Sequence, residues 1–476
     1  NNMDKCFTFK QILKFTLPSI IMMMFFSLYT IVDGIFISNY VGTTALGALN
    51  IIYPYQCLAI GTSVMIASGG SAIVGRTLGE HKQEDARKFF TMFVMVEIIS
   101  AITFLILGLS FQGPILKLLG ASDEQMPYAI KYYLIYTCFL PFSFLQNAFQ
   151  TLFVTAGKPH LGLGLVICAG IMNVFLDYFF LDICSMSIEG AALGTVLACL
   201  IPSVTGLLYF SFNRKETLYF VRFKFDFMRI KEAFTNGSSE MVTNLANAIS
   251  TFLFNYQCQK FYGDDGVASI TIILYFQFLF TAILFGYSMG IAPVFSYKYG
   301  KNDKKELKSI LRRSLAIIGT ISVLAYGLSF VLINPVAHLF SGGSKNVFDI
   351  TVNNFALYNS ASSLYFDSSF IIFDKLALLV IPLFPINVDI VTPANISITI
   401  IVTASGLVSA VISFSRTILF LTIALIVLPI IFKENGIWIS VPVAEAIGVF
   451  VSIFCLIKYR KKYLYDSCNQ KEDVLG

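Results

Sequence analysis

The chain has 476 residues, of which 56% are hydrophobic and only 13% are charged. Soluble globular proteins carry about 25% charged residues, so this composition excludes a soluble enzyme and predicts a polytopic membrane protein. The formal net charge of +5 then belongs to loops on one side of a membrane rather than to a nucleic-acid surface. Nine cysteines without a CxxC pair or a Cys/His cluster argue against both a disulfide framework and a zinc site.

The apolar runs predict twelve membrane-spanning helices, because about 20 apolar residues cross a bilayer as a helix. The first run has no small-residue cleavage site, so we expect it to stay as a span. The expected spans are residues 15–37, 46–74, 89–111, 132–155, 161–180, 191–212, 241–257, 267–295, 314–336, 351–373, 407–432 and 437–457.

Lys and Arg residues set the expected orientation by the positive-inside rule. Basic stretches alternate with loops poor in Lys and Arg, and this alternation holds along the whole chain. It predicts that both termini are cytoplasmic and that the number of spans is even. The basic stretches are residues 5–14, 76–88, 158–160, 214–231, 298–313 and 458–462.

The two halves of the chain repeat each other at an offset of 221 residues. Tyr40-Val41-Gly42 corresponds to Phe261-Tyr262-Gly263, and Pro114 corresponds to Pro335. Such repeats are typical of secondary transporters, and here they predict two six-helix lobes related by an axis along the membrane normal. The fold class is therefore all-α, with lobes at residues 1–212 and 235–462, a cytoplasmic linker at 213–234 and a tail at 463–476. The segment 360–403 departs from the repeat, and we interpret it as an extended outer loop or re-entrant segment.

A carboxylate inside the first span, Asp33, points to function, because a charge at the middle of a bilayer costs about 2.5–3.5 kcal/mol. Asp177 lies at a matching depth in the fifth span, Asn173 lies four residues earlier on the same helix face, and Thr195 lies in the sixth span. These oxygen-bearing side chains predict a site for Na⁺ or H⁺, since the same oxygens serve either ion. The alternative is that they only bond their neighbours and shape the bundle.

Other polar residues carry two interpretations each. Pro18 is either a static kink or a hinge that responds to Asp33. Glu240 lines a pathway or caps the start of the seventh span, and Glu97 is a pathway or a paired residue. Glu445 and Arg416, in consecutive spans, could pair. Tyr29 belongs to an aromatic and Met-rich stretch that suits a broad pocket for apolar cations or simply faces lipid.

Taken together, several motifs resemble the multidrug and toxic compound extrusion (MATE) family, in its bacterial DNA-damage-inducible-type branch. They cover nearly the whole chain, apart from the segment at 360–403. They are Leu17-Pro18, Tyr29 with Val32-Asp33, residues 146–150 with 156–159, Asn173 to Asp177, Gly190-Ala191-Ala192 with Thr195, residues 237–240, 290–293, 296–300 and 441–446.

The resemblance implies a two-lobed, V-shaped antiporter that exports amphipathic cationic compounds in exchange for Na⁺ or H⁺. It implies an ion site at Asp33, Asn173, Asp177 and Thr195, which would also be the metal site under Na⁺ coupling, with Pro18 as the hinge. We place Tyr29, Asn147, Gln150 and Glu240 along the substrate pathway.

We therefore expect a monomeric multidrug efflux protein of the cell membrane (the inner membrane), with cationic drugs and the lipid bilayer as partners. No nucleic acid and no cofactor other than the coupling ion are expected. The alternative is a lipid-linked oligosaccharide flippase of the same superfamily, which holds pyrophosphate in a cationic cavity. A membrane-embedded enzyme has no support, since no nucleophile–base pair or metal-ligand cluster is present in the sequence.

Overall fold

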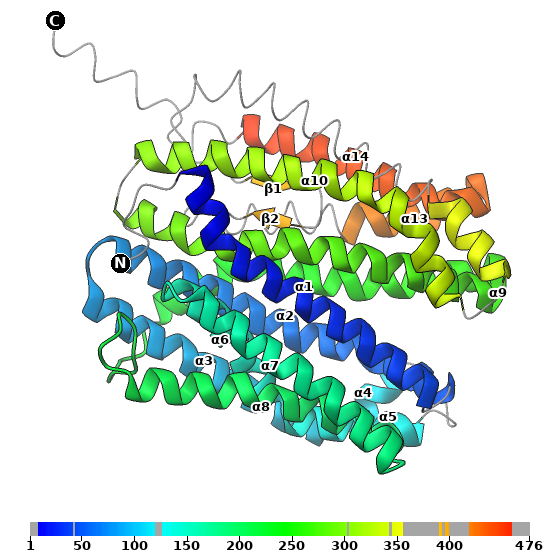
Figure 1. Cartoon of the computed structure of the whole chain (residues 1–476), viewed down its shortest axis with the longest axis horizontal. Coiled ribbons are helices and arrows are strands. Elements are labelled where there is room, and N and C mark those ends of the chain that lie inside the picture. The colour runs from blue at the N-terminus through cyan, green and yellow to red at the C-terminus, as the bar shows by residue number, and fades with distance from the viewer. Residues whose placement is uncertain are drawn as a thin grey trace, which may run out of the picture. The chain divides into compact units, whose positions relative to one another are not determined.

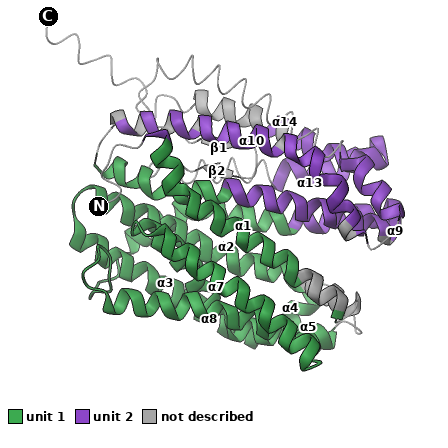
Figure 2. Cartoon of the chain, in the orientation of Figure 1, with its two compact units in different colours: residues 1–6, 10–248, 285–302 green, residues 7–9, 249–284, 303–476 purple. Residues whose placement is uncertain are grey.

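The computed structural model describes residues 8–40, 43–119, 126–301, 304–341, 345–355, 390–392, 396–398 and 418–458. The chain divides into two compact units (Figure 2). Unit 1 comprises residues 1–6, 10–248 and 285–302, and unit 2 comprises residues 7–9, 249–284 and 303–476. The lobe boundaries expected from the repeat stay a prediction.

Both units are built from helices (Figure 1). Unit 1 contains α1 (Phe9–Tyr40), α2 (Thr43–Gly79), α3 (Gln83–Ser110), α4 (Gln112–Leu118), α5 (Met126–Cys138), α6 (Leu140–Thr155), α7 (Pro159–Asp177), the π-helix η1 (Tyr178–Ile183), α8 (Ile188–Phe212) and both ends of α9 (Phe227–Gly300). Unit 2 contains the middle of α9, α10 (Lys304–Phe340), a helical stretch at 345–355, β1 (Ile390–Thr392), β2 (Ile396–Ile398), α13 (Leu421–Phe432) and α14 (Glu434–Lys458).

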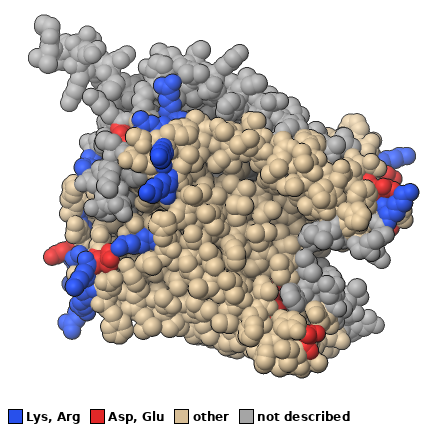
Figure 3. Space-filling view, viewed as in Figure 1, with Lys and Arg blue, Asp and Glu red and all other residues tan. Residues whose placement is uncertain are grey.

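Seven helical segments of the described residues are long and apolar enough to cross a membrane. They are Phe9–Asp33, Ile52–Gly79, Gln83–Ser110, Pro159–Ile183, Ile188–Phe212, Asp265–Gly300 and Arg312–His338. On the face shown in Figure 3, the described Lys and Arg side chains lie near the ends of helices, and uncharged side chains cover the band between. The prediction of an all-α membrane protein is thus confirmed, and the count of twelve spans in two lobes stays a prediction.

The structure corrects one expected span, residues 132–155. Two helices occupy it, because α5 ends at Cys138 and α6 begins at Leu140, with Phe139 between them at φ −99° and ψ 5°. Pro141 lies in the first turn of α6, where its missing N–H costs nothing; inside a longer helix it would leave a carbonyl unbonded.

Two further features concern the second half of the chain. At Gly263 the backbone takes φ 64° and ψ −150°, which divides α9 into two helical segments at the loop expected there. Within the irregular segment 360–403, β1 and β2 pair antiparallel with Ile390 opposite Ile398. The rest of that segment and Arg416 lie outside the described residues, as does the side chain of Glu445.

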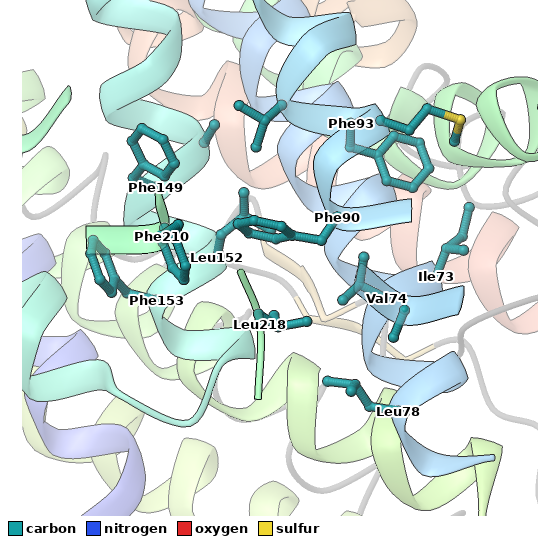
Figure 4. Close-up of a cluster of buried hydrophobic side chains, with 14 of the residues drawn as sticks. Ile73, Val74, Leu78, Phe90, Phe93, Phe149, Leu152, Phe153, Phe210 and Leu218 are labelled. Carbon is teal, nitrogen blue, oxygen red and sulfur yellow. The ribbon is translucent and has the colours of Figure 1, made fainter. Parts of the chain in front are cut away.

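A hydrophobic cluster rich in Phe side chains packs between α2, α3, α6 and α8 of unit 1 (Figure 4). The Phe90 ring lies 4.8 Å from the Phe210 ring, and Phe210 also packs against Phe149 and Phe153. Leu218, from the stretch between α8 and α9, belongs to the same cluster. The first part of the linker expected between the lobes, residues 213–226, therefore packs on unit 1. We call this stretch the strap.

Polar contacts hold this strap in place. Arg87 of α3 donates to the Thr217 carbonyl at 3.0 Å and lies 4.3 Å from the centre of the Tyr219 ring. Lys158 donates to Glu216 at 3.0 Å, and this hydrogen bond raises the pKa of the Lys158 ammonium. Both contacts join the strap to ends of unit 1 helices.

Within unit 1, α1 packs closely on the last part of α9 through two glycines. A side chain at Gly286 would place its Cβ 2.6 Å from both Ile20 Cα and the Ser19 carbonyl oxygen, and one at Gly290 would meet Ser19 at 3.2 Å. Lipid offers no hydrophobic drive to helix association, so small residues that allow close backbone approach stabilise such contacts. This contact borders Pro18, which is buried.

Gly286→Ala should therefore lower stability. The added methyl cannot fit against the α1 backbone, and overpacking of this kind costs about 1–3 kcal/mol. Gly327→Ala on α10 is the matched control, because nothing lies within 4 Å of a Cβ there. The measurement is the melting temperature of each purified variant in detergent. Equal melting temperatures for the two variants would contradict the close packing of α1 on α9.

Candidate cation-binding site

The predicted carboxylate site forms at the end of α7, where the helix changes type. Asp177 is the last residue of α7, and the chain continues into the π-helix Tyr178–Ile183. Single π-helical turns are frequent at functional sites. Asp177 is fully buried, and Asn173, four residues earlier on the same face, is 1% exposed. The local helix geometry thus presents an amide and a carboxylate side by side.

Asp33 of α1 completes the carboxylate pair. Its carboxyl group lies within hydrogen-bonding reach of the Asp177 carboxyl group. Both oxygens of Asp177, both polar atoms of the Asn173 amide and one buried oxygen of Asp33 lack a hydrogen bond of good geometry to any described residue. No described Lys or Arg acts electrostatically on either carboxyl group. Two adjacent buried carboxylates repel each other unless a cation or a proton lies between them.

The α8 helix borders Asp177 through Gly194. A Cβ at Gly194 would overlap the Asp177 carboxylate oxygen Oδ1, so only glycine leaves room for this carboxylate. The Thr195 hydroxyl donates to the Ala191 carbonyl at 3.1 Å, which leaves its oxygen as an acceptor. Gly194 was missed at the sequence level, where it is one of 32 glycines.

Two further side chains reach the site. The Tyr29 hydroxyl, one turn before Asp33, lies within hydrogen-bonding reach of Gln146 of α6. Tyr132 of α5 lies close enough to interact electrostatically with both aspartates, and Gln56 of α2 donates to its hydroxyl at 3.4 Å. Neither Gln146 nor Tyr132 was predicted as a site residue from the sequence.

The predicted pathway residues lie on α6 and α9. Gln150 is 7% exposed, and its amide nitrogen has no acceptor among the described residues. Because Gln146 lies four residues before it, the two amides share one face of α6, a signal that the sequence already contained. Asn147 is half-buried on the same helix. The pathway role of Asn147 and Gln150 stays a prediction.

Glu240 lies at the contact between α2 and α9. Its carbonyl accepts a hydrogen bond from Asn244 at 2.9 Å, and a Cβ at Gly61 would lie 3.1 Å from Asn244 Cβ. The interpretation of Glu240 as a helix cap is wrong, because α9 begins at Phe227 and Asp226 caps it by accepting from two backbone N–H groups. Its place on the pathway stays a prediction.

The chemistry of the donors fits a monovalent hard cation or a proton. The groups that lie together are the two carboxylates and, one turn before Asp177 on the same helix face, the Asn173 amide, and all of them offer oxygen atoms. Among the residues that the structure describes, no group of three or more His, Cys, Asp or Glu side chains could hold a metal ion. A transition-metal centre therefore has no support in the described part of the chain.

Several apolar helices long enough to cross a membrane, with two neighbouring carboxylates among them, are typical of a membrane transporter. The family model described as MatE matches residues 18–179 and 241–353, and the chain belongs to this family, the multidrug and toxic compound extrusion (MATE) transporters.

Curated relatives and solved structures agree with this family. The chain is 23% identical over 336 residues to the multidrug export protein MepA of Staphylococcus haemolyticus. The aligned part covers 70% of this chain and 74% of that protein. It is 22% identical over 341 residues to MepA of Staphylococcus aureus, and the aligned part covers 71% of this chain and 75% of that protein. The fold is similar to a MATE crystal structure in complex with MaL6, with a TM-score of 0.80 at 18% identity over 94% of this chain and 96% of the other.

A MOP superfamily transporter of Pyrococcus furiosus, described as having a binding pocket of reverse polarity, is similar at a TM-score of 0.78. The identity is 17%, over 93% of this chain and 94% of the other. These likenesses concern the fold.

Proposed function

We propose that the chain is a multidrug exporter that moves amphipathic cationic compounds out of the cell in exchange for Na⁺ or H⁺. The observation that carries this proposal is the pair of neighbouring carboxylates formed by the half-buried Asp33 of α1 and the buried Asp177 of α7, on which no described basic residue acts. The similarity to MepA proteins, which are multidrug export proteins, supports the choice of substrate.

The proposed mechanism uses the pair as a charge switch. With both carboxylates ionised, the site attracts a cationic compound, and the neighbouring Tyr29 ring offers an aromatic face. Uptake of H⁺ or Na⁺ from the outside neutralises the pair and weakens its attraction for the compound. Coupling follows because ion and drug bias the same conformational equilibrium through their different affinities for its two states. A bend of α1 at Pro18 would carry the change along the helix.

Export from proteoliposomes, with Na⁺ and pH gradients imposed separately, tests this proposal. We expect a fluorescent cationic compound to move against its gradient under one of the two ion gradients and to stop when that gradient is collapsed. Transport that is unaffected by either gradient would contradict ion coupling.

The same vesicles distinguish drug export from lipid-linked oligosaccharide flipping. A pyrophosphate group needs Lys or Arg side chains to hold it, whereas the described site offers carboxylates. We therefore expect no flipping of a fluorescent pyrophosphate-linked lipid above the rate in empty vesicles. Flipping of that lipid without movement of cationic compounds would favour the flippase.

A further inference from the structure

A second buried carboxylate, Glu97, lies in unit 1 in the middle of α3. It is 1% exposed, and neither of its carboxylate oxygens has a hydrogen bond of good geometry among the described residues. Phe93 and Ala101, one turn to either side on the same helix face, are both buried. Its surroundings are therefore apolar, and they disfavour a negative charge.

The one polar side chain known to act on Glu97 is Ser63 of α2. The Ser63 hydroxyl donates to the Phe144 carbonyl of α6 at 3.3 Å. Since that hydroxyl hydrogen is already used, the Ser63 oxygen can accept a hydrogen bond from a protonated Glu97 but gives little to an ionised one. Glu97, Ser63 and the Phe144 carbonyl thus join α3, α2 and α6.

No other described titratable group acts electrostatically on Glu97. In α3, Glu97 is the one titratable residue from Phe89 to Ser110; α6 has none, and α2 has none between residues 58 and 75. The titratable residues of other elements that contact α3 outside its first turn include Tyr133 of α5, and Asp226 and Arg229 at the start of α9. None of these groups, nor Asp33 or Asp177, acts electrostatically on Glu97.

We propose that Glu97 is a second proton-binding site of unit 1, independent of the Asp33–Asp177 pair, which holds one proton as a neutral acid that donates to Ser63. A proton fits better than a metal ion, because only Ser63 and one carbonyl already in use supplement the carboxyl oxygens. The site goes beyond the proposed exchange of drug for ion and does not depend on it.

Infrared difference spectroscopy on the purified full chain tests this proposal without any transport measurement. A protonated carboxylic acid gives a C=O stretching band that shifts in D₂O. We expect the wild-type spectrum at about neutral pH to contain such a band that disappears completely in Glu97→Gln. Glu84→Gln, at an exposed position of the same helix, is the matched control and should keep the band. The proposal is wrong if the band survives in Glu97→Gln, or if Asp33→Asn removes all of it.

Melting temperature as a function of pH gives a second measurement. A native state that holds a proton which the unfolded chain releases loses stability as pH rises above the ordinary Glu pKa of about 4.3. The Gln side chain stays neutral at every pH, so the melting temperature of Glu97→Gln should rise relative to wild type between about pH 5 and about pH 8. A difference that does not change with pH would overturn the proposal.

Discussion

Asp33→Asn is expected to lower ion-driven export by at least about tenfold while leaving the protein folded. The substitution keeps the shape of the side chain and removes the charge that the coupling ion neutralises. A charge-assisted hydrogen bond contributes about 1.5–3 kcal/mol, and about 1.4 kcal/mol corresponds to a factor of ten. The measurement is the initial rate of export of a fluorescent cation from proteoliposomes, together with release of bound compound on addition of Na⁺ or acid.

Asp182→Asn is the matched control for this experiment. Asp182 lies in the π-helix that follows Asp177, but its side chain is exposed. It should keep export and ion-triggered release at wild-type levels. If Asp33→Asn also kept both, Asp33 would have no part in coupling, and the carboxylate pair would be a packing feature of unit 1.

The expectation for Asp33 came from the sequence because a charge in an apolar run is rare and costly. The same reasoning found Asp177 and Asn173, and the helical period of 3.6 residues placed them on one face. The structure brings the two carboxyl groups within hydrogen-bonding reach of each other. Their role as an ion site stays a prediction, but their proximity could be anticipated from depth alone.

The rest of the site could not be found in this way. Gly194 matters because of the atom facing it, the Asp177 carboxylate, and a glycine in an apolar helix gives no sign of its partner. Tyr132 lies among many aromatic residues, and only the packing of α5 against α8 brings it to the aspartates. The break between α5 and α6 at Phe139 was also missed. The residues on both sides of it are apolar, so hydropathy predicts one continuous span there.

Gly194→Ala should damage the carboxylate site without altering any of its polar groups. The new methyl group would occupy the space of Asp177 Oδ1, so the carboxylate must leave its present position beside Asp33. Overpacking costs about 1–3 kcal/mol of stability. A displacement of this kind should raise the ion concentration needed for half-maximal export by about tenfold, since about 1.4 kcal/mol of binding free energy corresponds to that factor.

Gly164→Ala is the matched control, because nothing lies within 4 Å of a Cβ at this position of α7. There alanine should raise stability by about 0.5–1 kcal/mol through its better helix propensity.

A double variant separates the contact with Asp177 from general damage to the fold. Asp177→Ala removes the carboxylate that Gly194 accommodates, so Gly194→Ala should cost less stability in that background than in wild type. Residues in contact show such non-additivity, typically about 0.5–3 kcal/mol, whereas independent sites add. The measurement is the melting temperature of the four proteins of the cycle. Strictly additive changes would mean that Gly194 does not set the position of Asp177, and the geometry of the site would then have to be explained by α1 and α7 alone.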